Sequence, residues 1–238
     1  MQEHSHHNIN LTGEDRRRQE MKNVLIIGLG RFGYFTTKKL KELGMQVMAV
    51  DRNEEKVSAV IPFATRALIG DCTSQNFLSS IGVGNFDLCI VAIGDDFLAS
   101  LEITSLLKDL GARYVVARAS GEKEEKFLLR NGADHVVFPE REMADWTALR
   151  FSSEQIMNYI GVTGEYAIVE VTIPKDWQGK TVGELNIRNQ FGLNVLGIRN
   201  GSSEKNLDMD IAPDSVLHES GSVLVLGPVS RIRKVFKL

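Results

Sequence analysis

Three glycines in the segment VLIIGLGRFG have the spacing of a phosphate-binding loop. Gly28, Gly30 and Gly33 follow the pattern G-x-G-x-x-G, between a β-rich apolar run and a helical pattern. In such a loop the first glycine permits a tight turn, the second lets the backbone approach a pyrophosphate, and the third lets helix and strand pack closely. Arg31 stands at the start of the helix, where free N–H groups and the helix dipole favour an anion. The spacing predicts a nucleotide site, although these glycines could merely shape a βα turn.

An acidic residue at the end of the next β-rich run supports that prediction. Asp51 closes QVMAVD, at about the 20-residue distance at which a carboxylate accepts hydrogen bonds from both ribose hydroxyls. It would repel a 2′-phosphate, so NADP is disfavoured. The alternative is that Asp51 only caps the helix that follows.

Two further loops are expected at the same edge of the sheet. Gly70-Asp71-Cys72-Thr73 follows the third predicted strand and Ala92-Ile93-Gly94 follows the fourth, so both should border the adenosine pocket. Asp71 could equally be the N-cap of the helix that begins at Ser74. The residues expected to surround the nucleotide are Gly28, Gly30, Arg31, Phe32, Gly33, Asp51, Arg52, Asp71, Cys72, Ala92, Ile93 and Gly94.

These residues need a scaffold, and the hydrophobic pattern predicts one. The predicted strands are 23–28, 46–51, 65–69, 87–93, 113–118 and 134–138, and the predicted helices are 32–43, 53–60, 74–81, 95–109 and 121–131. Several helices end at a glycine, namely Gly44, Gly82, Gly111 and Gly132. Strands that alternate with helices predict an α/β fold with a Rossmann-like, doubly wound parallel sheet.

The pattern changes after Pro139. Residues 141–159 read as one helix with apolar side chains on broad faces, and this helix is expected to be a connector. The strand-like runs 166–173, 194–198 and 222–227, a short helix over 182–187 and a basic final helix then predict a small α+β domain. The expected organisation is a tail over 1–20, a nucleotide-binding domain over 21–140, a connector helix over 141–162 and a C-terminal domain over 163–238.

Composition limits the class of protein. The chain has 28 Lys and Arg against 31 Asp and Glu, with no basic block, which argues against a nucleic-acid partner. Cys72 and Cys89 form no CxxC or Cys/His pattern, so a zinc cage is excluded and a reducing compartment is favoured. Cys89, inside LCIVAI, is expected in the core. Without a long apolar run or a leader-like start, a cytoplasmic protein that reaches a membrane only through a partner is expected.

The first twenty residues lack hydrophobic periodicity. They contain His4, His6 and His7, which could indicate metal binding or part of a purification tag, but no carboxylate or cysteine is arranged nearby to complete a site. We expect a disordered tail.

Residues that could turn over a substrate are not evident. A dehydrogenase of this fold needs a proton donor or acceptor, and His135 and His218 have no orienting carboxylate at motif spacing, so each is expected to be structural or on the surface. No Walker lysine, G-x-S-x-G or Ser/Tyr-x-x-x-Lys arrangement supports another reaction. Binding without catalysis is the favoured class, and an NAD-dependent oxidoreductase or epimerase-like enzyme is the alternative. A scaffold with a permanent nucleotide is a third hypothesis.

The combined motifs resemble one family. GLGRFG, the acid in VDRNEEKV, IGDCTS, VAIGDD, NGADHVVFPER and the late EYAIVEV, in this order over residues 21–238, are similar to the Trk/Ktr potassium-uptake regulatory subunits. Those proteins consist of an RCK N-terminal (TrkA-N) domain and an RCK C-terminal (TrkA-C) domain. The resemblance implies a cytosolic homodimer that assembles into a ring, expected to be octameric, at the inner face of the membrane. It also implies binding of ATP or ADP, with NAD or NADH as further candidates, and control of a TrkH/KtrB-like membrane potassium channel or transporter subunit.

The resemblance also implies roles for particular residues. Arg31 is similar to the family arginine that reaches a nucleotide γ-phosphate across the dimer interface, where a guanidinium can bond a phosphate that ADP lacks; the alternative is a solvated surface arginine. Glu140 resembles a carboxylate that holds Mg²⁺ or Ca²⁺ beside ATP, and otherwise is a helix N-terminal acid that interacts with the dipole. Arg188 and Asn194 resemble a cyclic di-AMP site, or could simply cap a helix and a strand.

Overall fold

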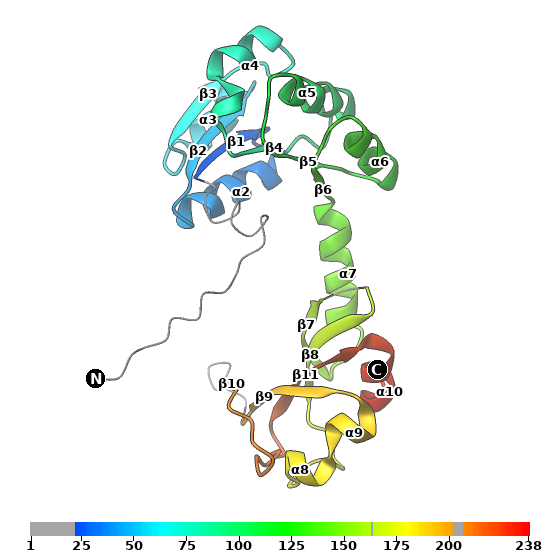
Figure 1. The fold of residues 1–238 in the computed structure, drawn as a ribbon. Helices are drawn as coiled ribbons and strands as arrows, with labels where there is room; N and C mark the ends of the chain where they lie inside the picture. The colour runs from blue at the N-terminus through cyan, green and yellow to red at the C-terminus, as the bar shows by residue number, and fades with distance from the viewer. Residues whose placement is uncertain (1–21, 163, 202–206) are drawn as a thin grey trace, which may run out of the picture. The chain divides into compact units, whose positions relative to one another are not determined.

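The computed structural model describes residues 22–162, 164–201 and 207–238. They form two compact units, one that ends at Glu140 and one that runs from Arg141 to Leu238 (Figure 1). The predicted tail over 1–20, with its three histidines, lies outside the described residues. No helix in the described ranges combines the length and the apolar character that a membrane crossing requires.

The first unit is a parallel sheet with helices on both faces. Its strands are β1 (Asn23–Ile27), β2 (Gln46–Asp51), β3 (Arg66–Ile69), β4 (Leu88–Val91), β5 (Val115–Arg118) and β6 (His135–Val137), in the spatial order β3-β2-β1-β4-β5-β6. The helices are α2 (Arg31–Glu42), α3 (Glu54–Val60), α4 (Gln75–Ile81), the short 3-10 turn η1 (Val83–Asn85), α5 (Phe97–Asp109) and α6 (Glu122–Arg130). The predicted Rossmann-like doubly wound sheet is confirmed.

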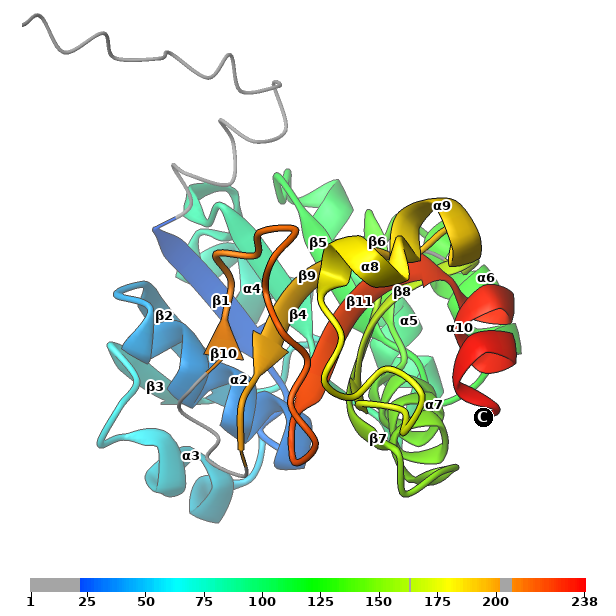
Figure 2. The same cartoon turned by 90° about the horizontal axis from the view of Figure 1, so that it is seen from below.

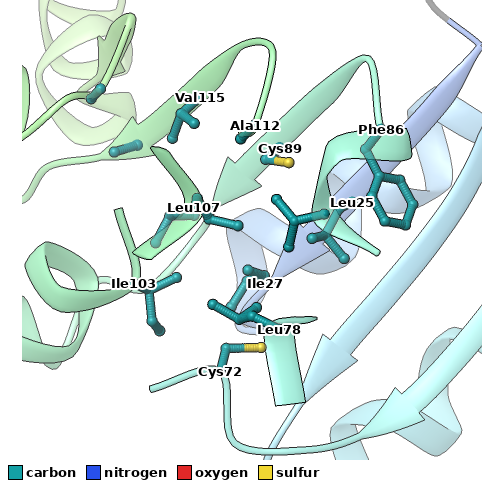
Figure 3. Packing of buried hydrophobic residues seen from close by; sticks show 14 of the residues in the cluster. Leu25, Ile27, Cys72, Leu78, Phe86, Cys89, Ile103, Leu107, Ala112 and Val115 are labelled. Atoms are coloured by element: carbon teal, nitrogen blue, oxygen red, sulfur yellow. The ribbon is translucent and has the colours of Figure 1, made fainter. Parts of the chain in front are cut away.

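The strands are apolar on both faces because helices cover both. Leu25 and Ile27 of β1 pack into one buried cluster, whereas Val24 and Ile26 point into a second cluster on the opposite face. Figure 3 shows the first cluster, in which Cys89 lies among aliphatic side chains. The prediction that Cys89 belongs to the core is confirmed, since its side chain is fully buried.

The order of the strands places a crevice beside β1. The chain builds outward from β1 through β2 to β3, and then returns to the other side of β1 with β4. The helices that follow β1 and β4 therefore diverge, and their starts open a crevice at the carboxyl ends of these two strands. This is the topological switch point at which such sheets bind ligands.

The second unit begins with the remainder of α7 (Pro139–Phe151), which starts two residues before the boundary. It continues with β7 (Ile156–Gly161), β8 (Tyr166–Thr172), α8 (Val182–Leu185), α9 (Ile187–Phe191), β9 (Asn194–Arg199), β10 (Leu207–Asp208), β11 (Ser222–Pro228) and α10 (Val229–Phe236). The strands form an antiparallel sheet in the order β10-β9-β11-β8-β7, and Figure 2 shows β11 between β9 and β8. The predicted small α+β domain is confirmed.

Two element predictions in this unit are wrong. The helix predicted over 141–159 ends at Phe151, because residues 156–161 pair with β8 as an antiparallel edge strand. Residues 152–155, SSEQ, separate the two segments. Because the pairing partner lies later in the chain, helical periodicity alone could not exclude the longer helix. The single helix predicted over 182–187 is divided into α8 and α9 at Asn186, whose φ of 43° is left-handed.

A buried ion pair joins three strands of the second sheet. Glu170 of β8 is 5% exposed, and its Oε1 accepts hydrogen bonds from Arg199 Nε of β9 at 2.7 Å and from Ser222 Oγ of β11 at 2.6 Å. Burial alone would raise the pKa of Glu170, but these two hydrogen bonds and the charge of Arg199 outweigh burial, so the pKa lies below its ordinary value.

Candidate functional site

A cavity of about 630 Å³ opens at the carboxyl ends of the parallel strands. Its volume is within the range of small-molecule sites. The residues that line it are Ile27, Gly28, Gly30, Arg31, Phe32, Val50, Asp51, Arg52, Lys56, Gly70, Asp71, Cys72, Ala92, Ile93, Gly94, Asp95, Asp96, Ala99, Ile103, Arg118 and Glu140. The structure thus brings together every residue that the sequence placed around the nucleotide, with one exception, and adds others that the motifs did not indicate.

The exception is Gly33, which is buried behind the loop. A Cβ at Gly33 would lie 1.9 Å from the carbonyl oxygen of Gly28, so the start of α2 can pack against the loop only without a side chain there. Gly28 itself has a φ of +93°, and its N–H donates to the Val50 carbonyl at 2.9 Å. A Cβ at Gly30, in contrast, would meet no described atom within 4 Å. Of these three glycines, Gly30 therefore combines an open Cβ position with a place in the cavity lining, so a ligand can approach its backbone.

The start of α2 is suited to an anion. Gly30 is its N-cap, with no side-chain hydrogen bond to the helix from the described residues, and the first turn contains no acidic residue. The first-turn N–H groups and the positive end of the helix dipole therefore remain for a ligand. Arg31 is exposed and lines the cavity at this point.

Asp51 is attached to the glycine loop. Its Oδ2 accepts a hydrogen bond from the Leu29 N–H at 2.7 Å, and its Oδ1 accepts one from the Asn53 N–H at 2.8 Å. The N-cap of α3 is Asn53, whose side chain accepts from the Lys56 N–H. The alternative in which Asp51 caps α3 is therefore wrong.

The N-cap alternative for Asp71 is also wrong. Ser74 caps α4, whereas Asp71 Oδ1 accepts from Thr73 Oγ1 at 2.7 Å and from the Thr73 N–H at 3.0 Å. Both hydrogen bonds from Thr73 lower the pKa of Asp71, and Arg52 contributes a smaller effect in the same direction. Asp71 is therefore an exposed anion at the rim of the cavity.

Cys72 lies beside these carboxylates but is not a nucleophile. Burial, followed by the negative charges of Asp71 and Asp51, raises the pKa of its thiol to about 12. A thiol with that pKa carries almost no thiolate near neutral pH. Cys72 therefore contributes a small apolar surface to the cavity wall.

The cavity lining also contains an ion pair that the motifs did not indicate. Arg118, the last residue of β5, donates from Nη2 to Oε1 of Glu140 in the first turn of α7. Ala92, Ile93 and Gly94, which follow β4 between β1 and β5 in the sheet, also line the cavity. Arg118 could have been found only from its position at the carboxyl end of a predicted strand, because no local motif marks it.

The charges around the cavity are mixed. Cationic and acidic side chains share its lining; the cationic ones are Arg31, Arg52, Lys56 and Arg118, and the acidic ones are Asp51, Asp71, Asp95, Asp96 and Glu140. Asp96 is used locally, because it caps α5 by accepting from the Ala99 N–H. In the described parts of the chain, no group of three or more His, Cys, Asp and Glu could hold a metal ion. A cation at Glu140 would therefore need oxygen ligands from the bound molecule as well.

Four other predicted residues lie elsewhere. Arg188 is exposed on α9 and Asn194 is exposed at the first position of β9, and neither lines the cavity. The N-cap of α9 is Asn186, not Arg188. His135 in β6 and His218 in the loop before β11 are exposed and also lie outside the cavity lining.

Comparison with known proteins finds relatives along nearly the whole chain. Residues 24–139 match the TrkA-N domain and residues 167–238 match the TrkA-C domain. The chain is 37% identical over 216 residues to Ktr system potassium uptake protein C of Bacillus subtilis (strain 168), which covers 91% of this chain and 96% of that protein. It is 36% identical over 213 residues to Ktr system potassium uptake protein A of the same strain, with 90% and 95% covered.

A solved structure shares the fold. The GsuK channel bound to NAD superposes with a TM-score of 0.64 at 19% identity, over 92% of this chain and 39% of that chain.

Proposed function

The chain belongs to the family of Ktr potassium uptake proteins, with a TrkA-N and a TrkA-C domain. We propose that it is a cytosolic, nucleotide-sensing regulatory subunit of a membrane potassium channel or transporter. In this proposal the TrkA-N domain binds ATP or ADP, and the identity of the nucleotide changes the assembly that contacts the membrane subunit. The expected assembly is a homodimer that closes into an octameric ring.

One observation carries the nucleotide part of the proposal. Three features meet at the cavity. The Cβ position of Gly30 is open, the start of α2 has no side-chain cap among the described residues, and the Asp51 carboxylate is hydrogen-bonded to the same loop. A pyrophosphate fits the N–H groups at the start of α2, and a ribose fits the carboxylate. The GsuK channel, which shares the fold, binds NAD, and this supports a nucleotide as the ligand class.

Arg31 is the residue that we propose as the sensor. It is exposed at the cavity rim, where its guanidinium can form charge-assisted hydrogen bonds to an additional phosphate. A ligand shifts a conformational equilibrium only by its difference in affinity for the two states. If a third phosphate engages Arg31 in one assembly and not in the other, ATP and ADP favour different assemblies.

Glu140 is proposed to share a divalent cation with a triphosphate. A carboxylate beside phosphates is repelled unless a cation lies between them, and Mg²⁺ and Ca²⁺ both prefer oxygen ligands. Because Glu140 lines the cavity, the cation would be held by this side chain together with phosphate oxygens.

Catalysis is the competing proposal. An NAD-dependent oxidoreductase requires a group that moves a proton beside the nucleotide, and His135 and His218 both lie outside the cavity lining. Turnover of NAD in the presence of candidate substrates would favour the enzyme. A scaffold with a permanent nucleotide would instead show no exchange of bound ADP for added ATP.

A thermal-shift titration tests the sensor. The full chain is titrated with ATP, ADP, NAD and NADP, with and without Mg²⁺ or Ca²⁺, and Arg31→Ala is compared with Arg66→Ala, which alters an exposed arginine that does not line the cavity. Arg31→Ala is expected to weaken ATP binding by about ten- to a hundredfold, the effect of a hydrogen bond to a charged group, while ADP binding is retained. Equal losses for both nucleotides would contradict the proposed role of Arg31.

Potassium flux tests the regulation itself. The protein is purified with its membrane subunit and reconstituted, and flux is measured while ATP replaces ADP. A change in flux that Arg31→Ala abolishes supports the proposal, and flux that is independent of the nucleotide contradicts it. Cyclic di-AMP is titrated in parallel against wild type and Arg188→Ala. Binding to wild type that is lost in Arg188→Ala would assign this second ligand to the TrkA-C domain.

A further inference from the structure

Arg118 and Glu140 form an ion pair inside the cavity that is proposed to hold the nucleotide. Arg118 ends β5 and Glu140 is in the first turn of α7, so the pair joins the sheet to the helix that continues into the second unit. The two side chains differ in exposure, since that of Arg118 is 19% exposed and that of Glu140 is 58% exposed. The Arg118 side chain is therefore the more buried partner of the pair, and the Glu140 side chain is the more exposed one.

The guanidinium of Arg118 lies in a slot that Gly94 leaves open. A Cβ at Gly94 would lie 1.7 Å from Nη1 of Arg118, a distance at which one of them must move. The Gly94 carbonyl also accepts a hydrogen bond from Ser120 Oγ at 2.9 Å, which attaches this loop to the residues after β5. Gly94 thus has a role beyond bordering the predicted adenosine pocket, because it gives Arg118 its position.

Arg118 has donors that Glu140 does not use. A guanidinium has five N–H donors, and its Nε is buried without a hydrogen-bond partner among the residues that the structure describes. A buried donor that lacks an acceptor is unfavourable. The side chain also lines the cavity, so an anionic oxygen there would meet an arginine with unused donors.

We propose that Arg118 is the resident counter-ion of Glu140 and competes with a divalent cation for its carboxylate. Without the cation, Glu140 pairs with Arg118. When a cation accompanies a polyphosphate, the exposed glutamate leaves Arg118 for the cation, and the arginine donors that it releases turn to the anionic oxygens of the nucleotide. This inference rests on the proposed nucleotide site and deepens it, because Arg118 then sets the cation concentration at which the site changes state.

Charge and connectivity support the exchange. Glu140 is a single carboxylate and, within the described chain, belongs to no group of three metal-ligating side chains, so it holds a cation only when phosphates contribute ligands. Arg118 then prevents an unpaired carboxylate in the cation-free state. Because Glu140 lies in the first turn of α7, the exchange of partners occurs at the start of the helix that connects the two units.

Two titrations of the full chain test the exchange. The first measures the melting temperature at saturating ATP against Ca²⁺ or Mg²⁺ concentration, in wild type and in Arg118→Gln. Arg118→Gln is expected to shift the half-saturating cation concentration by about two- to fivefold, the range of an exposed ion pair. A lower value means that loss of the competitor dominates, and a higher value means that loss of the donors released to the nucleotide dominates. The second measures ADP affinity in EDTA, where Glu140→Gln is expected to tighten binding by about two- to fivefold because Arg118 is released from its partner.

The double variant separates this mechanism from a structural role. In Arg118→Gln with Glu140→Gln, the gain in ADP affinity should vanish, because the two changes act on one interaction. Gly94→Ala, which displaces the guanidinium, should shift the cation dependence in the same direction as Arg118→Gln. Arg113→Gln is the matched control: Arg113 also pairs with an acid, Asp87, but it does not line the cavity, and it should change neither titration.

The outcomes distinguish this inference from the proposed function. If wild type binds ATP and ADP but Arg118→Gln leaves the cation dependence unchanged, the exchange is wrong and the nucleotide site stands. If ADP affinity in EDTA is unchanged or lower in Glu140→Gln, the exchange is also wrong. This result can be obtained even if Arg118→Gln does not fold. Absence of nucleotide binding in wild type would overturn both proposals.

Discussion

The carboxylate of Asp51 holds the backbone of Leu29, with 2.7 Å between Oδ2 and the amide nitrogen. Leu29 lies between the first two glycines of the loop, and Asp51 ends the neighbouring strand β2. The acid that is proposed to bind the ribose therefore also holds the loop that is proposed to bind the phosphates. One side chain connects the two halves of the proposed nucleotide site.

These two roles of Asp51 can be separated by substitution. Asp51→Asn keeps an oxygen acceptor for the Leu29 N–H but removes the charge and the acceptor for the Asn53 N–H. Because the charge is lost, we expect the preference for NAD over NADP to fall by about fivefold, equivalent to about 1 kcal/mol of charge repulsion. Asp51→Ala removes the acceptor as well, and should weaken binding of every nucleotide. Calorimetric titration of NAD, NADP and ADP measures both effects. An unchanged NAD to NADP ratio in Asp51→Asn would contradict the repulsion.

Gly30→Ala is expected to weaken nucleotide binding without unfolding the protein. Gly30 has a φ of −64°, which alanine adopts freely, and its Cβ position is empty of described atoms. Stability should change by no more than about 0.5 kcal/mol, whereas the methyl group intrudes on the ligand and costs about 1–3 kcal/mol of binding. ADP titration and thermal unfolding provide the two readouts.

Two glycines are controls for this experiment. Gly33→Ala should destabilise the fold itself, because its Cβ would overlap the Gly28 carbonyl oxygen. Gly121→Ala should change neither nucleotide binding nor stability. Gly121 is another helix N-cap with open space at its Cβ position, but it lies outside the cavity lining. Equal loss of stability in Gly30→Ala and Gly33→Ala would show that Gly30 is a folding residue instead.

The buried Glu170 should make the second unit sensitive to acid. Its pKa is lower in the folded state than the ordinary value, which is about 4.3, so its contribution to stability is full above that value and is lost as pH falls through the folded pKa. Glu170→Gln removes this contribution and, because Arg199 loses its charged partner, should cost about 3 kcal/mol at pH 7. The difference in unfolding free energy between wild type and Glu170→Gln should become smaller below about pH 4, because wild type loses the contribution of the Glu170 charge.

Tryptophan fluorescence measures this effect selectively. Both tryptophans of the chain, Trp146 and Trp177, belong to the second unit, so denaturant titrations from pH 7 to pH 3.5 report its unfolding. Glu219→Gln, at an exposed position, is the control and should follow wild type. A constant difference between Glu170→Gln and wild type across this range would show that Glu170 does not titrate as described.

Both cysteines should be unreactive in the folded protein. Burial raises the thiol pKa of Cys72 and of Cys89 to about 12, and neither is in a disulfide. At pH 8 a disulfide reagent should therefore label neither thiol in native buffer and both in denaturant. Rapid labelling of Cys72 in the native protein would mean that the cavity wall opens readily.

Local sequence determined the main parts of this protein. The alternation of apolar strands and amphipathic helices is a short-range property, and it was sufficient to predict the doubly wound sheet and the small α+β domain. Gly28 needs its positive φ whatever surrounds it, and Asp51 ends a strand that the pattern makes evident. The glycine spacing of this loop can therefore be recognised from its own residues, although Asp51 and the Val50 carbonyl also hold its backbone.

Tertiary structure decided what depends on partners distant in the chain. Residues 156–161 became a strand because β8 pairs with them, although their own pattern also suited a helix. Arg118 and Glu140 are 22 residues apart and meet only because β5 and β6 are neighbours in the sheet. Side-chain pairing of this kind is set by strand order, and strand order is a property of the complete fold, so the counter-ion of Glu140 could be identified only from the structure.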